Sequence, residues 1–190
     1  MPSKRISHKN AFVFAILLFF LGGIFSYLVN STAFAITILF GILLFIYSWK
    51  LPYYKYFGNF IVALSTGFAL IFGASFSGNF FVISLLALSA FFANLARELI
   101  KDTEDIKGDK GGKISLPQIL SLEKVNLLVL LYSILAIIVS YLPPILVIVF
   151  GFSEFAKFST IRYFILITIA NAVIVRSQML NYKKEYKKAQ

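Results

Sequence analysis

The stretch AFVFAILLFFLGGIFSYL, residues 11–28, decides the fold class, because it carries no charged side chain over the length of a membrane span. A helix needs about 20 apolar residues to cross a bilayer core. The run is longer than the apolar part of a secretory signal, no small-residue cleavage site stands out, and another apolar run follows closely. We therefore interpret it as a retained membrane helix.

The composition of the whole chain agrees with this interpretation. Its 190 residues are 59% hydrophobic and only 14% charged, and the mean hydropathy is +0.87. One soluble core cannot hide so much apolar surface. The sequence therefore predicts an integral membrane protein.

Further apolar runs follow, separated by short polar joints. They cover residues 32–48, 60–75, 80–94 continuing toward residue 100, 125–142 and 161–175. With the first run they predict an all-α, polytopic bundle of about six spans, in one domain over residues 1–190. The segment PPILVIVFGFSEFAKFST, residues 143–160, is short and interrupted, so we predict a half-span or an interfacial piece there.

The positive charges indicate an orientation. The formal net charge is +10, and most lysines and arginines lie before the first run or after the second, fourth and sixth runs. Positively charged loops remain in the cytoplasm and face anionic headgroups, so we expect a cell-membrane protein with both termini cytoplasmic. Lys157 and Arg162 are the exceptions to this pattern. A membrane surface explains the basic residues better than nucleic acid does.

The residue types limit the available chemistry. The chain has no cysteine and one histidine, His8, which we interpret as a surface residue without a catalytic partner. Thiolate sites, cysteine nucleophiles and disulfides are therefore excluded, and zinc is disfavoured. Oxygen ligands remain.

The oxygen ligands concentrate in RELIKDTEDIKGDKGGK, residues 97–113, which holds five of the eight acidic residues. At 100° per residue, a continuing helix would place Glu98, Asp102, Asp105 and Asp109 on one stripe about 60° wide. Two interpretations are open: a solvated loop that fixes topology, with its charges neutralised by neighbouring lysines and arginines, or a Mg²⁺ site that also holds a ligand phosphate. Hard oxygen ligands on one face favour the second.

This region also resembles a known family. NLARELIKDTEDIKGDKGGKISLP, residues 94–117, resembles the second aspartate-rich motif of the UbiA superfamily of intramembrane prenyltransferases, and within it the archaeal geranylgeranylglycerol-phosphate geranylgeranyltransferase branch. PSKRIS, residues 2–7, is similar to the segment after that family's first motif, and residues 47–74 resemble its central helices. The likeness covers nearly the whole chain.

The resemblance also implies what the chain lacks. Family members have about nine helices and a first motif of the form NDxxDxxxD, which would precede residue 1 here. We expect a chain without those first helices and without the last one, through a misplaced start, a split gene or a true truncation. A partner chain that supplies the first motif is one possibility.

The resemblance implies specific roles for several residues. Asp102, Asp105 and Asp109 are the expected catalytic metal ligands, for Mg²⁺, and Lys101, Arg97 and Lys50 the expected contacts to a substrate diphosphate. The implied reaction transfers a geranylgeranyl group from geranylgeranyl diphosphate to geranylgeranylglyceryl phosphate, which forms the second ether bond of an archaeal-type membrane lipid. The alternatives are a non-catalytic fragment or half of a split enzyme, a quinone-type aromatic acceptor and, ranked last, a small transporter.

Three polar residues have two interpretations each. Asn59 either lines the polar mouth or caps its helix. Asn94 either extends the acidic stripe inward or bonds a neighbouring helix. Lys50 either contacts phosphate, as above, or anchors a helix end at the membrane surface.

Overall fold

The computed structural model describes residues 7–50, 55–78, 80–105, 115–150 and 160–189, and all the regular secondary structure in these ranges is helical. The helices are α1 (His8–Val29), α2 (Ser31–Lys50), α3 (Lys55–Ser77), α4 (Phe80–Asp105), α5 (Leu116–Ile119), α6 (Leu122–Phe150) and α7 (Thr160–Ala189). The all-α, polytopic architecture predicted from the sequence is confirmed.

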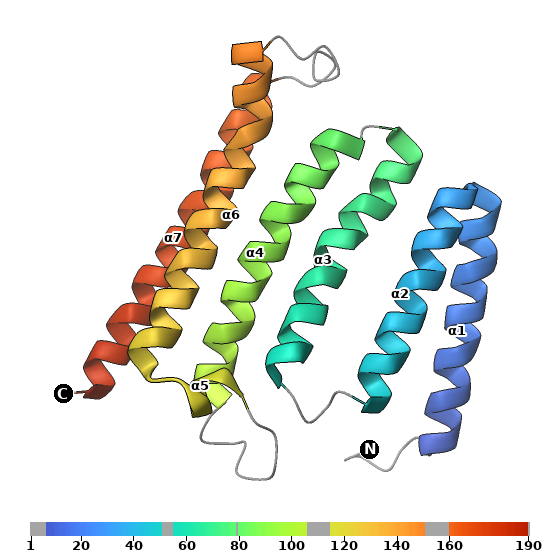
Figure 1. Ribbon diagram of the computed structural model, residues 1–190, viewed down its shortest axis with the longest axis horizontal. Helices are drawn as coiled ribbons and strands as arrows, with labels where there is room; N and C mark the ends of the chain where they lie inside the picture. Colours follow the sequence, from blue (N-terminus) through green and yellow to red (C-terminus); the bar gives the residue numbers. More distant parts are fainter. Residues whose placement is uncertain (1–6, 51–54, 79, 106–114, 151–159, 190) are drawn as a thin grey trace.

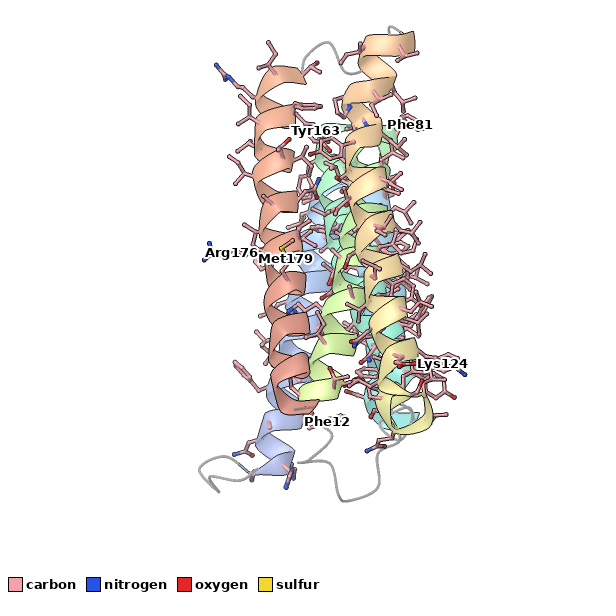
Figure 2. All side chains as sticks on the ribbon, turned by 90° about the vertical axis from the view of Figure 1, so that its left-hand side faces the viewer. Phe12, Phe81, Lys124, Tyr163, Arg176 and Met179 are labelled. Carbon is pink, nitrogen blue, oxygen red and sulfur yellow. The ribbon has the colours of Figure 1, made fainter. Side chains whose placement is uncertain are left out.

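The long helices form a curved row. They follow one another in chain order in Figure 1, and each packs against its neighbour: α1 on α2, α2 on α3, α3 on α4, α4 on α6 and α6 on α7. Figure 2 shows α1 and α7 on the same side of α6, so the row bends around a concave side. Helix α4 lies in the middle of this row. Its last residues, and the first residues of α1, lie at the end of the row that we call the acidic end, defined by Glu98, Asp102 and Asp105.

Five of the described helices are long and apolar enough to cross a membrane, namely α1, α2, α3, α4 and α6. The apolar surface that they expose is the surface expected to face lipid: α1 has a single buried residue, Ser26. The predicted sixth span, residues 161–175, lies in α7. The predicted spans therefore all fall inside helices, and each helix extends beyond the predicted bounds at one end or at both.

The prediction for residues 143–160 was wrong in its first part. Helix α6 continues through Pro143 and Pro144 to Phe150, whereas we expected the span to end before the prolines. The remaining residues, 151–159, lie outside the described ranges. A proline removes one helical hydrogen bond, but a membrane helix tolerates it where a neighbouring helix satisfies the freed carbonyl group.

Helix α7 provides this compensation at Ser140. Pro144 has no N–H to donate to the Ser140 carbonyl group, four residues earlier, and the Tyr163 hydroxyl donates to that oxygen at 2.7 Å. Asn171 donates from Nδ2 to the Ser140 hydroxyl at 3.0 Å. Ser140 is fully buried. Both of its oxygens are thus bound from α7, which fixes α6 against α7.

The hydrogen bond from Tyr163 to the Ser140 carbonyl oxygen should stabilise the folded protein. We expect Tyr163→Phe to lower the free energy of unfolding by about 1–3 kcal/mol, because it leaves a buried carbonyl oxygen without its donor. Thermal unfolding in detergent, followed by circular dichroism, measures the change. Tyr141→Phe is the matched control: it removes a hydroxyl that contacts Thr168 Oγ1 at 3.0 Å between the same helices, but at an exposed position. Equal effects of the two substitutions would contradict the explanation.

Small residues bring α3 and α4 close together. Asn59, Ala63 and Gly67 recur every four residues on α3, and all three are buried. A Cβ atom added at Gly67 would lie 2.8 Å from the backbone oxygen of Ala87 on α4. Small residues at helix interfaces allow such close backbone approach in membranes. The position of Asn59 relative to α4 is therefore set by the backbone packing.

On its other side, α4 packs on α6 at the acidic end. The buried cluster there consists of Ala96, Leu99, Val125 and Val129, and α5 covers it with Leu116. The part of α4 that carries the carboxylates is thus packed between α3 on one side and α6 on the other.

Candidate active site

Asp102 is the most deeply buried carboxylate in the described chain, at 2% exposure. Its Oδ2 accepts a hydrogen bond from Asn59 Nδ2 at 2.7 Å, between two helices and across 43 residues of sequence. Burial of a charged group is costly unless it is hydrogen-bonded. The amide of Asn59 supplies one such bond without adding a charge.

This contact decides between the two interpretations of Asn59. Helix α3 begins at Lys55, so Asn59 stands in its second turn and does not cap it. The capping interpretation is wrong. The side chain instead lies in the polar mouth beside the carboxylate stripe.

Glu98 has a different environment from Asp102. It is also buried, at 5% exposure, but Lys101 Nζ lies 3.1 Å from its Oε2 and Arg97 Nη1 lies 3.8 Å from its Oε1. The side chains of both cations are mostly exposed. Arg97 and Lys101 therefore neutralise Glu98, as one of the two interpretations of the basic residues expected. The expected contact of both residues to a phosphate stays a prediction.

Of the remaining predicted site residues, the structure describes Asp105 fully, Lys50 only in its backbone and Asp109 not at all. Asp105 is exposed in the last turn of α4, three residues after Asp102. Lys50 ends α2, but its side chain lies outside the described part, and so does the whole of Asp109. The structure thus brings Asp102 and Asp105 together on one helical turn, next to Lys101.

Asn94 links the stripe to α3. Its Nδ2 donates to Thr66 Oγ1 at 2.5 Å and to the Val62 carbonyl oxygen at 3.5 Å, and its Oδ1 accepts from Arg97 Nη1 at 3.5 Å. The interpretation that it bonds a neighbouring helix is confirmed. It also holds the guanidinium of Arg97, one turn closer to the acidic end.

A groove runs along this face of α4, bounded by α7 and α3, with a volume of about 680 Å³. It is lined by Thr66, Ala90, Ala93, Asn94, Ala96, Arg97, Ile100, Lys101, Glu104, Val173 and Ile174. The charged side chains lie at its acidic end, and the remainder is largely aliphatic. Such a groove suits a molecule with an anionic head and an apolar tail.

The donors at the acidic end fit Mg²⁺. This ion prefers oxygen ligands and commonly uses one or two carboxylates, with waters and substrate phosphates completing its shell. Asp102 and Asp105 supply two carboxylates a turn apart, and the buried one accepts a hydrogen bond from Asn59. Within the described ranges, no three acidic or histidine side chains come close enough to enclose an ion by themselves.

These features define a class: a polytopic helical membrane protein in which one helix, α4, carries a buried carboxylate near its end and also lines a largely apolar groove with Arg97, Lys101 and Glu104 at the same end. The sequence matches the UbiA prenyltransferase family over residues 1–190. The chain belongs to this family.

Its curated relatives include enzymes named digeranylgeranylglyceryl phosphate synthase. The one from Thermococcus kodakarensis is 37% identical over 145 residues, which are 75% of this chain and 52% of the relative. The one from Methanococcus aeolicus is 46% identical over 62% of this chain and 42% of the relative, and the one from Methanosphaera stadtmanae is 33% identical over 100% of this chain and 66% of the relative. The chain thus spans about half the length of most of these relatives.

A solved structure shares the fold. It is described as giving structural and mechanistic insights into the biosynthesis of digeranylgeranylglyceryl phosphate synthase in membranes. It matches with a TM-score of 0.76 and 32% identity, over 97% of this chain and 63% of that chain.

Proposed function

We propose that this chain carries the prenyl diphosphate site of a Mg²⁺-dependent transferase, which moves a geranylgeranyl group from geranylgeranyl diphosphate to geranylgeranylglyceryl phosphate. The observation that carries the proposal is the arrangement at the end of α4, where the buried Asp102 and the exposed Asp105 lie within about two helical turns of Arg97 and Lys101, which line the groove. The names of the relatives support the choice of acceptor.

The proposed reaction exchanges one carbon–oxygen bond for another. The bond between C1 of the geranylgeranyl group and the diphosphate oxygen breaks, and the diphosphate leaves with the electron pair. A hydroxyl oxygen of the acceptor bonds to C1, forms the ether and loses its proton to water. When bound, Mg²⁺ supplies the positive charge that stabilises the leaving diphosphate.

The chain's own residues bind and orient the reactants in this proposal. Asp102, Asp105 and Asp109 hold the metal, and Lys101, Arg97 and Lys50 bind phosphate oxygens. Preorganised positive groups in a site of low dielectric constant stabilise a developing anion more than water does. The aliphatic part of the groove, with Ala90 and Val173, holds the prenyl chain and keeps water from the reacting carbon.

The location follows from the spans and the charges. Several helices of spanning length place the chain in a membrane as a multi-pass protein. We propose that the acidic end faces the cytoplasm, with both termini on that side, because the basic joints of the sequence lie there.

A second candidate follows from coverage: the chain aligns with 52% of the Thermococcus kodakarensis relative. It is a metal-dependent prenyl diphosphate binder that has no transferase activity when residues 1–190 are tested alone. Binding with no transfer would favour this candidate, and a co-expressed segment with an NDxxDxxxD motif would then restore transfer.

A transfer assay tests the proposed reaction. The chain in liposomes receives labelled geranylgeranyl diphosphate, Mg²⁺ and one acceptor at a time: geranylgeranylglyceryl phosphate, an aromatic carboxylic acid of the quinone-precursor type, or a long-chain alcohol. We expect an ether product only with the glyceryl phosphate, and no product with EDTA. A prenylated aromatic product would show that the acceptor is wrong while the prenyl diphosphate site is right.

A further inference from the structure

The polar pair formed by Asn59 and Asp102 crosses the interface between α3 and α4 at the acidic end. Asn59 is 8% exposed and Asp102 is 2% exposed, and their side chains meet at 2.7 Å. An asparagine amide donates from nitrogen and a carboxylate only accepts, so the direction of this hydrogen bond is fixed. One oxygen of Asp102 is therefore tied to α3.

The donor is fixed in place by its backbone. Asn59 begins the series of small buried residues that continues with Ala63 and Gly67, and the backbones of α3 and α4 come close at Gly67. A short side chain between two packed helices has few alternative rotamers. This sets it apart from Lys101 and Arg97, which are long, mostly exposed side chains around Glu98 and can turn toward a ligand. The amide of Asn59 has no such freedom.

We infer that Asn59 is a positioning residue, whose amide holds the Asp102 carboxylate in the orientation in which it binds a divalent cation together with a prenyl diphosphate. The inference rests on the proposed function of Asp102 as a metal ligand. Hydrogen bonds to ligating carboxylates from outside the metal shell orient them, and losing such a partner typically lowers metal affinity about 10- to 100-fold.

The same contact has a simpler explanation, in which it only stabilises the packing of two membrane helices. The two explanations differ in one measurable quantity. A stabilising contact changes the unfolding temperature and leaves the cation affinity of the folded protein unchanged. A positioning contact changes the cation affinity of protein that is still folded.

The test measures Mn²⁺ binding by electron paramagnetic resonance, with the full chain in nanodiscs and a non-reactive thiolo analogue of geranylgeranyl diphosphate present. We expect Asn59→Ala to raise the Mn²⁺ concentration at half-saturation about 10- to 100-fold. Asn59→Ser should act similarly, because a helical serine bonds its own preceding turn, as Ser65 does to the Ile61 carbonyl oxygen. Asn59→Gln retains the amide and should restore part of the affinity.

Ser89→Ala is the matched control. Ser89 also bonds α4 to a neighbour, from its hydroxyl to the Ala136 carbonyl oxygen on α6 at 2.8 Å, but it lies outside the groove lining and away from the carboxylates. Ser89→Ala should have a lower unfolding temperature than the unchanged chain and the same Mn²⁺ concentration at half-saturation. Unchanged half-saturation in folded Asn59→Ala or Asn59→Ser would overturn the inference and leave the proposed function standing. A wild-type chain that binds no Mn²⁺ would overturn both.

Discussion

Asp102→Asn should remove Mg²⁺-dependent binding of a prenyl diphosphate while the chain remains folded. The substituted side chain has the same shape, and its amide oxygen can still accept the hydrogen bond from Asn59 Nδ2, so the α3–α4 contact survives. The negative charge is lost. We expect an affinity loss of at least about 100-fold, because charge stabilisation by a metal is worth several kcal/mol and about 1.4 kcal/mol corresponds to a factor of ten.

Isothermal titration calorimetry with the thiolo analogue, with Mg²⁺ or with EDTA, measures this effect without requiring turnover. Asp105→Asn, one turn further along α4, should weaken binding in the same direction. Glu123→Gln is the control, because it removes one exposed carboxylate at the start of α6 and changes the net charge equally. Identical titrations of Asp102→Asn and the unchanged chain in Mg²⁺ would rule out the proposed metal site.

Gly67→Val should separate α3 from α4. Even the first carbon of a side chain at this position would lie 2.8 Å from the Ala87 backbone oxygen, and a backbone atom cannot swing aside as a flexible side chain can. Overpacking of this kind typically costs about 1–3 kcal/mol. The displacement should also lengthen the bond between Asn59 and Asp102, so the variant should lose both thermal stability and metal-dependent binding.

Gly73→Ala is the matched control in the same helix. A Cβ atom at Gly73 meets nothing within 4 Å, so the substitution adds a methyl group without a clash and with a better helix former. Its unfolding temperature should equal or exceed that of the unchanged chain. If Gly67→Val behaved like Gly73→Ala, the close approach of the two backbones would not be a property of the protein in its membrane.

The sequence predicted best the features that a single helix determines. Helix α4 continues to Asp105, so the angular relation of Glu98, Asp102 and Asp105 follows from 100° per residue. The membrane spans could be predicted from unbroken apolar runs, because a helix crosses the bilayer core only if its apolar run is long enough. The proximity of Arg97 and Lys101 to the carboxylates also followed, since these residues are one and three positions from Glu98.

The contacts between helices could not be predicted in the same way. Nothing in the sequence near Asn59 shows that it meets Asp102, 43 residues away, because helix packing brings them together. The sequence wrongly predicted that the span ends before Pro143 and Pro144, again because a contact between helices is involved. The hydroxyl that replaces the missing proline N–H belongs to Tyr163 on the next helix. A signal was present in both cases: a polar residue stood in an apolar helix and required a partner.

The bond from Tyr163 to Ser140 has a consequence for biogenesis. A carbonyl group without a donor in hydrocarbon costs several kcal/mol, so the proline-containing half of α6 is less stable in lipid when α6 is alone than when α7 is beside it. Partition from the insertion machinery into the bilayer should therefore occur for α6 and α7 as a hairpin. A chain that ends before residue 163 and is released from the ribosome should therefore insert α6 less efficiently than a chain that continues through α7.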